Sequence, residues 1–389
     1  MRARRNHIDL TILISVLTLM VISLAVVYSA SSTWALEKFG ESDRLLGSHA
    51  LKVLMGFTMI FVFMNIDYRR LRGFTKPALI ISIVILIVTL ALGGEVKGAA
   101  RWLRFGGFGF QPSELAKYAL LFHLAVLMAV KQERVREFKT GFLPLMVWVV
   151  AVTLLVLLQP NFSTGVMIVL VSFLMLYIGG ARISHMAGAV GAALPLLLAY
   201  MMSASYRRAR VLSFLSGATQ ELGSASYQRW QGIIGFGSGG IFGLGPGASR
   251  QRDFFLPESY GDFVFSILGE EYGLIGTVCI MVIFLVIMFR GLKIAKHAQD
   301  DFGRYLAIGI VSSITLFALV NAAVTLGILP TTGLPMPFIS YGGSSVLFSS
   351  IAVGVLLNIS SQTALHPRLK NVGERNAVAE QVPAVGKVY

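Results

Sequence analysis

A polar loop gives way to a long apolar run at Leu256-Pro257-Glu258-Ser259-Tyr260-Gly261-Asp262-Phe263-Val264-Phe265. The whole loop extends from Ser203 to Asp262, and it is the one long polar segment of a chain built otherwise of hydrophobic spans. Its last residue places a carboxylate at a membrane boundary, and arginines lie in the same loop. This combination indicates chemistry on a charged, lipid-linked substrate.

The composition places the rest of the chain in a bilayer. Hydrophobic residues make up 55% of the 389 residues and charged residues 13%, which is about half the charged fraction of an average soluble protein. The net charge is +14, but the positive residues punctuate apolar spans and form no basic face, so we expect no nucleic-acid partner. A single cysteine, Cys279, excludes an internal disulfide and a cysteine-rich metal site, and we expect it to pack within its apolar run.

Ten apolar stretches are long enough to cross a membrane as helices. The fold predicted is therefore an all-α polytopic membrane protein with about ten transmembrane helices and a large extracytoplasmic loop between helices 7 and 8. One membrane domain covers residues 1–365, and residues 366–389 are predicted to form a disordered cytoplasmic tail. The predicted spans are 9–30, 49–66, 77–93, 112–130, 142–159, 161–179, 186–203, 263–289, 305–329 and 344–360.

Lysine and arginine in the connections orient the spans, because cytoplasmic segments carry the excess of positive residues. With the N-terminus inside, 20 of the 33 basic residues fall in inner segments and 11 in outer ones, six of them in the long loop. Both termini are thus predicted to be cytoplasmic. The first span follows Arg2, Arg4 and Arg5 like a signal peptide, but its apolar stretch is longer than a usual signal core, and we expect it to be retained.

An ionisable pair lies at the start of the fourth span. Glu114 and Lys117 are spaced i, i+3, so they share a helical face and can pair, and Pro112 suits the first turn of that helix. One interpretation is a structural ion pair that makes two membrane charges tolerable. The other is a polar floor to a substrate cavity, since ionisable residues within a membrane are usually functional. The sequence favours neither.

The long loop carries an arginine cluster, Tyr206-Arg207-Arg208-Ala209-Arg210. Arginine suits bidentate contact with phosphate, although the cluster could equally touch solvent or lipid headgroups. Further on, Gly235–Gly240 matches the G-x-G-x-x-G dinucleotide fingerprint, which we reject because no strand or βαβ unit surrounds it. We expect instead a glycine-rich loop whose backbone can approach a ligand closely.

Three carboxylates lie at or near the start of the eighth span. Asp262 is predicted either to cap that helix or to face a cavity, and one side chain can do both. Glu270 and Glu271 would lie about 12–14 Å along the helix from Asp262. They need partners or water at that depth, and Lys117, Lys52 and His49 are the partners that we expect.

A second irregular segment, Leu329 to Ser345, contains three prolines, which exclude a regular helix there. Irregular backbone at membrane depth is tolerated only against protein or a wet cavity. We therefore expect a re-entrant loop that lines such a cavity.

Five blocks, in order and together spread along nearly the whole chain, resemble the SEDS family (shape, elongation, division, sporulation), also known as the FtsW/RodA/SpoVE family. Tyr28-Ser29-Ala30-Ser31 is more similar to its FtsW branch than to its RodA branch. The blocks are Arg101-Trp102-Leu103, Gln111-Pro112-Ser113-Glu114-Leu115-Ala116-Lys117, Tyr206–Arg210, Leu256-Pro257-Glu258 with Asp262-Phe263, and Pro337-Phe338-Ile339-Ser340-Tyr341-Gly342-Gly343-Ser344-Ser345.

The resemblance implies a peptidoglycan glycosyltransferase of the bacterial cytoplasmic (inner) membrane, at the division septum, that polymerises lipid II. Implied partners are lipid II, a class B penicillin-binding protein transpeptidase, other divisome proteins and membrane lipid. The family's essential aspartate maps to Asp262, which would be the catalytic base. Candidate substrate-binding residues are Arg101, Glu114, Lys117, Arg207, Arg208, Arg210, Ser340, Tyr341, Gly342, Gly343 and Ser344.

A divalent cation, Mg²⁺ or Mn²⁺, could share in stabilising the pyrophosphate, but the sequence shows no dedicated cluster of metal ligands. One departure from the family is Asn161, which stands where an acid is common, so Glu114 and Lys117 would balance each other without a third carboxylate.

Two rival functions stay open. A lipid II flippase should depend on midplane residues such as Glu270, Glu271 or Lys117, whereas a polymerase should depend on outer-face Asp262. A scaffold that only recruits a transpeptidase would need no single charged residue. The sequence also leaves open a role in division, elongation or sporulation.

Overall fold

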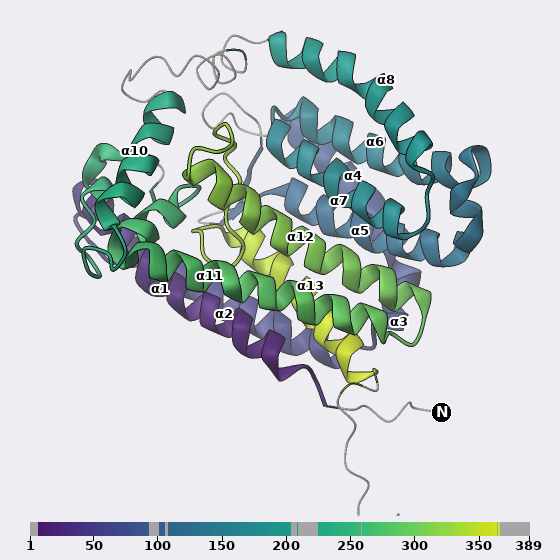
Figure 1. Ribbon diagram of the computed structural model, residues 1–389, viewed down its shortest axis with the longest axis horizontal. Coiled ribbons are helices and arrows are strands. Elements are labelled where there is room, and N and C mark those ends of the chain that lie inside the picture. Colours follow the sequence, from purple (N-terminus) through teal and green to yellow (C-terminus); the bar gives the residue numbers. More distant parts are fainter. Residues whose placement is uncertain are drawn as a thin grey trace, which may run out of the picture.

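The computed structural model describes residues 7–92, 101–105, 108–203, 208, 225–257, 259–363 and 365. Within them the chain is a bundle of long apolar helices (Figure 1). All ten predicted spans coincide with helices. Nine helical segments among the described residues are long and apolar enough to cross a membrane, and the tenth span is the 17-residue α7. The all-α membrane fold predicted from the sequence is confirmed.

The elements follow the predicted spans, with short turns between them. The helices are α1 Leu10–Phe39, α2 Arg44–Asn65, α3 Tyr68–Leu71, α4 Thr75–Leu92, α5 Pro112–Lys131, α6 Leu143–Leu158, α7 Phe162–Ile178, α8 Ile183–Met202, α10 Ala225–Gly239, α11 Val264–Lys296, α12 Asp301–Thr325 and α13 Gly343–Ser361. Short 3-10 turns are η1 Arg72–Phe74 and η2 Gln132–Arg136, and π-helical turns are η3 Phe138–Phe142 and η4 Gln251–Phe255.

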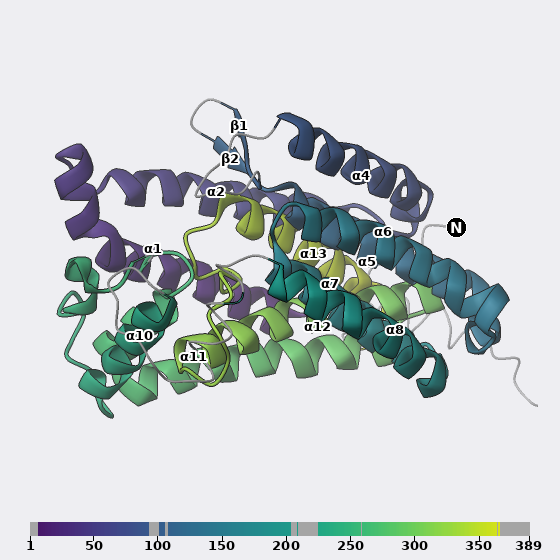
Figure 2. The ribbon, with the colours of Figure 1, turned by 90° about the horizontal axis from the view of Figure 1, so that it is seen from above.

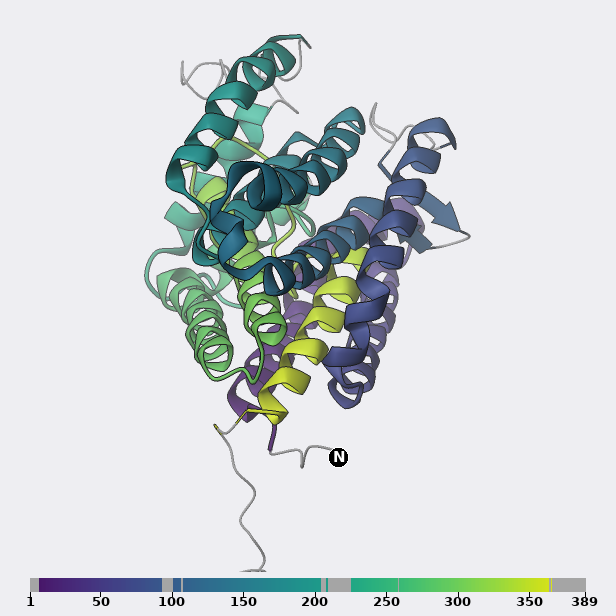
Figure 3. The same ribbon diagram turned by 90° about the vertical axis from the view of Figure 1, so that its right-hand side faces the viewer.

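One end of the bundle gathers the segments predicted to be cytoplasmic. The Asp9 backbone N–H, just before α1, donates to Ser360 Oγ near the end of α13 at 3.0 Å. Arg290 near the end of α11 pairs with Asp9 at 2.6 Å. Arg69 in α3 pairs with Asp300, which caps the start of α12. The two ends of the membrane domain therefore lie on the same side (Figure 3), as the prediction for the termini requires.

The opposite end gathers the segments predicted to be outside. A hairpin of β1 Leu103–Phe105 and β2 Phe108–Phe110, which was not predicted, precedes α5 there. The Gln111 backbone N–H donates to Ser344 Oγ at the start of α13. The stretch between α12 and α13 forms no helix, as its prolines predict, and Leu334, Met336, Phe338 and Ile339 are buried in it. We call this stretch the re-entrant loop, and its place at membrane depth stays a prediction.

The helices pack unevenly around α5, α12 and α13, which hold much of the buried core. Pairs in contact include α2 with α13, α11 with α12, and α4 with α5. By contrast α8 has no buried residue and lies at the edge of the bundle (Figures 1 and 2). It is attached at its outer end, where Tyr200 Oη donates to the Leu157 carbonyl at 2.5 Å.

Two smaller expectations were wrong. The glycines at 235–239 belong to helix α10 and not to a loop, and the small size of Gly235 and Gly239 lets α10 pack closely against α11. Cys279 is exposed on α11, since that helix turns one face away from the bundle. The predicted tail, residues 366–389, lies outside the described residues.

Candidate active site

Asp262 lies in a turn immediately before α11 and is half-buried. The helix begins at Val264 and its N-cap residue is Phe263, which has no capping side chain. The interpretation of Asp262 as the cap is therefore wrong, because the helix starts one residue later than that role requires. The carboxylate is positioned beside the helix entrance.

Asn321 of α12 holds the backbone at Asp262. Its Nδ2 donates to the Asp262 carbonyl at 2.8 Å and to the Leu334 carbonyl, in the re-entrant loop, at 2.7 Å. The amide is buried, so it joins the two loops where water cannot replace it. Gly333 lies against the carboxylate: a Cβ there would come within 3.2 Å of Asp262 Oδ2. Its φ of +71° also favours glycine.

The polar residues predicted in the re-entrant loop mostly make hydrogen bonds that stabilise the loop and the start of α13. Ser340 Oγ accepts from the Met336 N–H, and Ser344 Oγ accepts from the Gln111 N–H, both at 2.8 Å. Gly342 and Gly343 form the N-cap and first residue of α13. Tyr341 reaches furthest: its N–H donates to the Tyr260 carbonyl, two residues before Asp262, at 3.0 Å. Tyr341 is thus the member of this set that the structure ties to Asp262.

The predicted Glu114–Lys117 pairing is confirmed. The two side chains are buried, and Lys117 Nζ lies 2.8 Å from Glu114 Oε2. Lys117 also lies over the Phe317 ring of α12, 4.0 Å from its centroid. Phe317 and Asn321 are one helical turn apart on α12, so the ion pair and Asp262 approach the same face of that helix. The pair can therefore contribute to the floor of one site.

Asn161, which stands where the family acid is common, is buried beside the fourth span. Its Nδ2 donates to Ser113 Oγ at 3.3 Å. The position is thus used as a neutral link between α5 and the α6–α7 turn, and it adds no third charge to the ion pair.

Arg101 has a structural use. Its Nε donates to the Gln159 carbonyl at 3.2 Å and its Nη2 to the Pro160 carbonyl, so it ties the outer loop to the end of α6. Of the arginine cluster, Arg208 is exposed, while Arg207 and Arg210, like Glu258, lie outside the described residues. The described residues therefore include Arg101 and Arg208 but not the other two predicted cationic residues.

A mostly apolar cavity of about 330 Å³ opens near the outer end, between α2, β2 and the start of α13. Lys52 stands at its edge, with Nζ 3.7 Å from the centroid of the Tyr341 ring. Its lining is Lys52, Met55, Gly109, Phe110, Gly343, Ser344 and Leu347. A larger cavity of about 600 Å³ lies at the inner end, between Ile178, Lys296 and Arg304, far from every predicted site residue.

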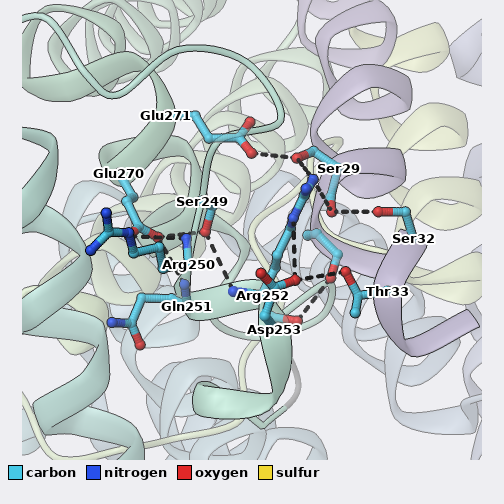
Figure 4. A network of polar contacts seen from close by, with 12 residues as sticks. Ser29, Ser32, Thr33, Ser249, Arg250, Gln251, Arg252, Asp253, Glu270 and Glu271 are labelled. Carbon is cyan, nitrogen blue, oxygen red and sulfur yellow. Dashed lines mark hydrogen bonds and ion pairs between the residues drawn. The ribbon is translucent and has the colours of Figure 1, made fainter. Parts of the chain in front are cut away.

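The expected partners of Glu270 and Glu271 were wrong, as Figure 4 shows. Glu270 accepts from Ser249 Oγ, from Ser238 Oγ at 3.2 Å, and from the backbone N–H groups of residues 250 and 251, each at 3.2 Å. Glu271 accepts from Ser29 Oγ in α1. The outer loop and α10 supply donors to Glu270 and α1 supplies one to Glu271, so lysines of other helices are not needed.

The described residues hold no group of three or more histidine, cysteine, aspartate or glutamate side chains that could bind a metal ion. Asp262 therefore belongs to no such group within the part of the chain that the structure describes, and Glu258, four residues earlier, lies outside that part. Sequence reasoning missed Asn321, although an amide within an apolar span was a usable signal.

The family model described as "Cell cycle protein", for FtsW, RodA and SpoVE, matches residues 9–365. A "Probable peptidoglycan glycosyltransferase FtsW" of Geobacter metallireducens is 41% identical over 356 residues, which cover 91% of this chain and 95% of that protein. "Stage V sporulation protein E" of Bacillus subtilis is 38% identical over 364 residues, covering 92% and 99%.

Solved structures share the fold. A chain from a peptidoglycan synthase complex, reported as coordinating polymerization and crosslinking, aligns with a TM-score of 0.74 and 25% identity, covering 91% of this chain and 97% of that one. The rod shape determining protein RodA of Thermus thermophilus aligns with a TM-score of 0.68 and 24% identity, covering 92% and 98%.

Proposed function

Because this chain belongs to the FtsW/RodA/SpoVE family, we propose that it is a peptidoglycan glycosyltransferase that polymerises lipid II at the outer face of the cytoplasmic membrane. The observation that carries the proposal is the position of Asp262. It lies at the outer end, on a loop that Asn321 and Tyr341 fasten to the re-entrant segment. The sugars and pyrophosphate of a lipid-linked substrate would reach that depth.

The chemistry needs a base and a stabilised leaving group. The hydroxyl of one sugar attacks the anomeric carbon of another, the new glycosidic C–O bond forms, and the bond from that carbon to the pyrophosphate oxygen breaks. Asp262 accepts the hydroxyl proton as general base, and undecaprenyl pyrophosphate leaves with the electron pair. A carboxylate that is half-buried beside a helix entrance can reach a hydroxyl from the outer side.

Cationic groups are needed where charge develops on the pyrophosphate. Arg207, Arg208 and Arg210 of the long loop keep this proposed role, and the exposed side chain of Arg208 supports it. Lys52 is a further candidate, since it stands at the edge of the apolar cavity, which could take the first part of the lipid chain. Arg101 is less suitable, because its guanidinium donates to two carbonyls.

The proposed partner is a class B penicillin-binding protein transpeptidase, and the proposed location is the division septum. Support comes from the synthase complex with a matching fold and from the FtsW names of relatives such as that of Geobacter metallireducens.

Polymerisation of labelled lipid II by the purified protein, with and without its cognate transpeptidase, tests the function. We expect glycan polymer, with more in the presence of the partner. Movement of lipid II across vesicle membranes without any polymer in either mixture would favour the flippase instead.

A further inference from the structure

Glu270 is an unusual buried carboxylate because its described hydrogen bonds come from hydroxyls and backbone N–H groups, not from a cation (Figure 4). Its side chain is 1% exposed. The four donors come from the end of α10 and from Ser249 to Gln251, at the start of η4. One side chain of α11 therefore holds two separate segments of the outer loop.

The backbone beside Glu270 is fastened as well. The Leu244 N–H donates to the Glu270 carbonyl at 2.9 Å, and the Gly245 N–H donates to the Glu271 carbonyl at 3.0 Å. These carbonyls are available because α11 is interrupted at Gly273, whose φ is +65°. A Cβ at Gly243 would lie 2.1 Å from the Glu271 carbonyl oxygen, so only glycine permits this approach.

Helix α1 secures the next part of the same loop. Thr33 Oγ1 donates to Asp253 Oδ1 at 2.7 Å, and Ser259 Oγ donates to the Ala30 carbonyl at 2.9 Å. Arg252 Nη1 donates to Ser29 Oγ at 3.1 Å. The Tyr28–Ser31 motif has no part in the proposed catalysis, and its residues Ser29 and Ala30 instead accept hydrogen bonds from the outer loop.

We propose that Glu270 is a positioning residue for Asp262. The loop from Ser249 to Asp262 leaves its anchor at Glu270, passes along α1 and returns to the entrance of α11, the helix that carries Glu270. The anchor fixes where the loop starts, and Asn321 fixes where it ends. Release of the anchor lets the loop shift along α1, and the general base then loses its alignment with the attacking hydroxyl. The inference rests on the proposed function of Asp262.

Glu271 supplies a matched control on the same helix. It has the same carboxylate and the same 1% exposure, and it accepts a hydrogen bond from Ser29 Oγ, while the backbone N–H groups of Gly247 and Ser249 and the charge of Arg252 also favour its carboxylate. Its Oε2 is buried without a hydrogen-bond partner among the described residues. A glutamine there can keep its oxygen on Ser29 Oγ and turn its N–H₂ to the Oε2 position, so the replacement should disturb Glu271 less than Glu270. At Glu270 the amide N–H₂ would face a backbone N–H that cannot turn to accept, so residue 250 or 251 loses its acceptor.

The experiment compares Glu270→Gln with Glu271→Gln in the full-length protein with its transpeptidase. In Glu270→Gln we expect kcat for lipid II polymerisation to fall about 10- to 100-fold, as for a misplaced catalytic group, with little change in KM. Ser249→Ala, which removes one of the four donors, should give a smaller loss and covers the case that Glu270→Gln does not fold. Glu271→Gln should stay close to wild type. Equal kcat in Glu270→Gln and Glu271→Gln would overturn the proposal.

Loop position is read independently of activity. In a Cys279→Ser background, Thr33→Cys and Asp253→Cys are joined by a short bifunctional thiol reagent, without lipid II. Glu270→Gln should lower the cross-linking yield, and Glu271→Gln should not. A fall in kcat with an unchanged yield would also overturn the proposal. If Asp262→Asn proved fully active, the proposed function would fail, while the cross-link would still report whether Glu270 anchors the loop.

Discussion

Asp262 and Glu270 are eight residues apart at the start of one helix, yet their surroundings differ in kind. Glu270 is buried, and four hydrogen-bond donors surround its oxygens. Asp262 is half-buried in a turn, and its backbone carbonyl accepts a hydrogen bond from Asn321. A carboxylate that is buried among four donors holds the loop in place, whereas one that lies half-buried at the outer helix entrance is positioned for chemistry.

This difference changes how the flippase hypothesis can be tested. A transporter that uses Glu270 at the membrane midplane should lose function in Glu270→Gln. A polymerase whose outer loop is anchored by Glu270 should lose function in the same variant, so this variant does not separate the two hypotheses. The discriminating residues are therefore Asp262 and the Glu114–Lys117 pair.

The largest effect on stability is expected at the Glu114–Lys117 pair. Lys117→Met strands a carboxylate that is 2% exposed and should lower the free energy of unfolding by about 3–5 kcal/mol. The double variant Glu114→Gln/Lys117→Met should lose much less, because no buried charge is left alone. Thermal unfolding in detergent measures both. If the loss of unfolding free energy in the double variant equalled the sum of the losses in the two single variants, direct pairing would be contradicted.

The next effect is expected at the clamp on Asp262. Asn321→Leu leaves the Asp262 and Leu334 carbonyls without this donor, at about 1–3 kcal/mol each, and should lower kcat for polymerisation. Asn358→Leu is the matched control, since Asn358 is equally buried but bonds Tyr68 and Met64 at the inner end. It should cost stability and spare kcat. Similar kcat in the two variants would mean that the clamp does not serve Asp262.

A smaller contrast separates two arginines. Arg101→Gln removes bonds to two carbonyls and should lower stability by about 1 kcal/mol, with little change in lipid II affinity. Arg208→Gln, at an exposed position, should leave stability within about 0.5 kcal/mol and weaken lipid II binding. Binding and unfolding measured on both variants check this. Weaker lipid II binding in Arg101→Gln together with lower stability in Arg208→Gln would contradict this assignment.

Local patterns predicted much of this molecule. The ten spans follow from apolar length, the irregular stretch before α13 from Pro330, Pro335 and Pro337, and the ion pair from the i, i+3 spacing of Glu114 and Lys117. Each of these depends on residues near one another in the chain.

The partners of the buried polar groups could not be predicted. Glu270 meets Ser249, and Asn321 meets Leu334, only after helices have packed and loops have folded back between them. The hairpin before α5 and the helical state of Gly235–Gly239 also depend on packing against other elements, which no local pattern encodes.

Polymerisation of lipid II by purified Asp262→Asn is the most direct test of the central claim. Asparagine keeps the size and the backbone contacts but cannot accept the proton, so the rate should fall by about 10²- to 10⁴-fold. Folding and transpeptidase binding should be retained. Glu41→Gln, an exposed carboxylate between α1 and α2, should polymerise at the wild-type rate. Near wild-type polymerisation by Asp262→Asn would contradict the claim that this carboxylate is the general base.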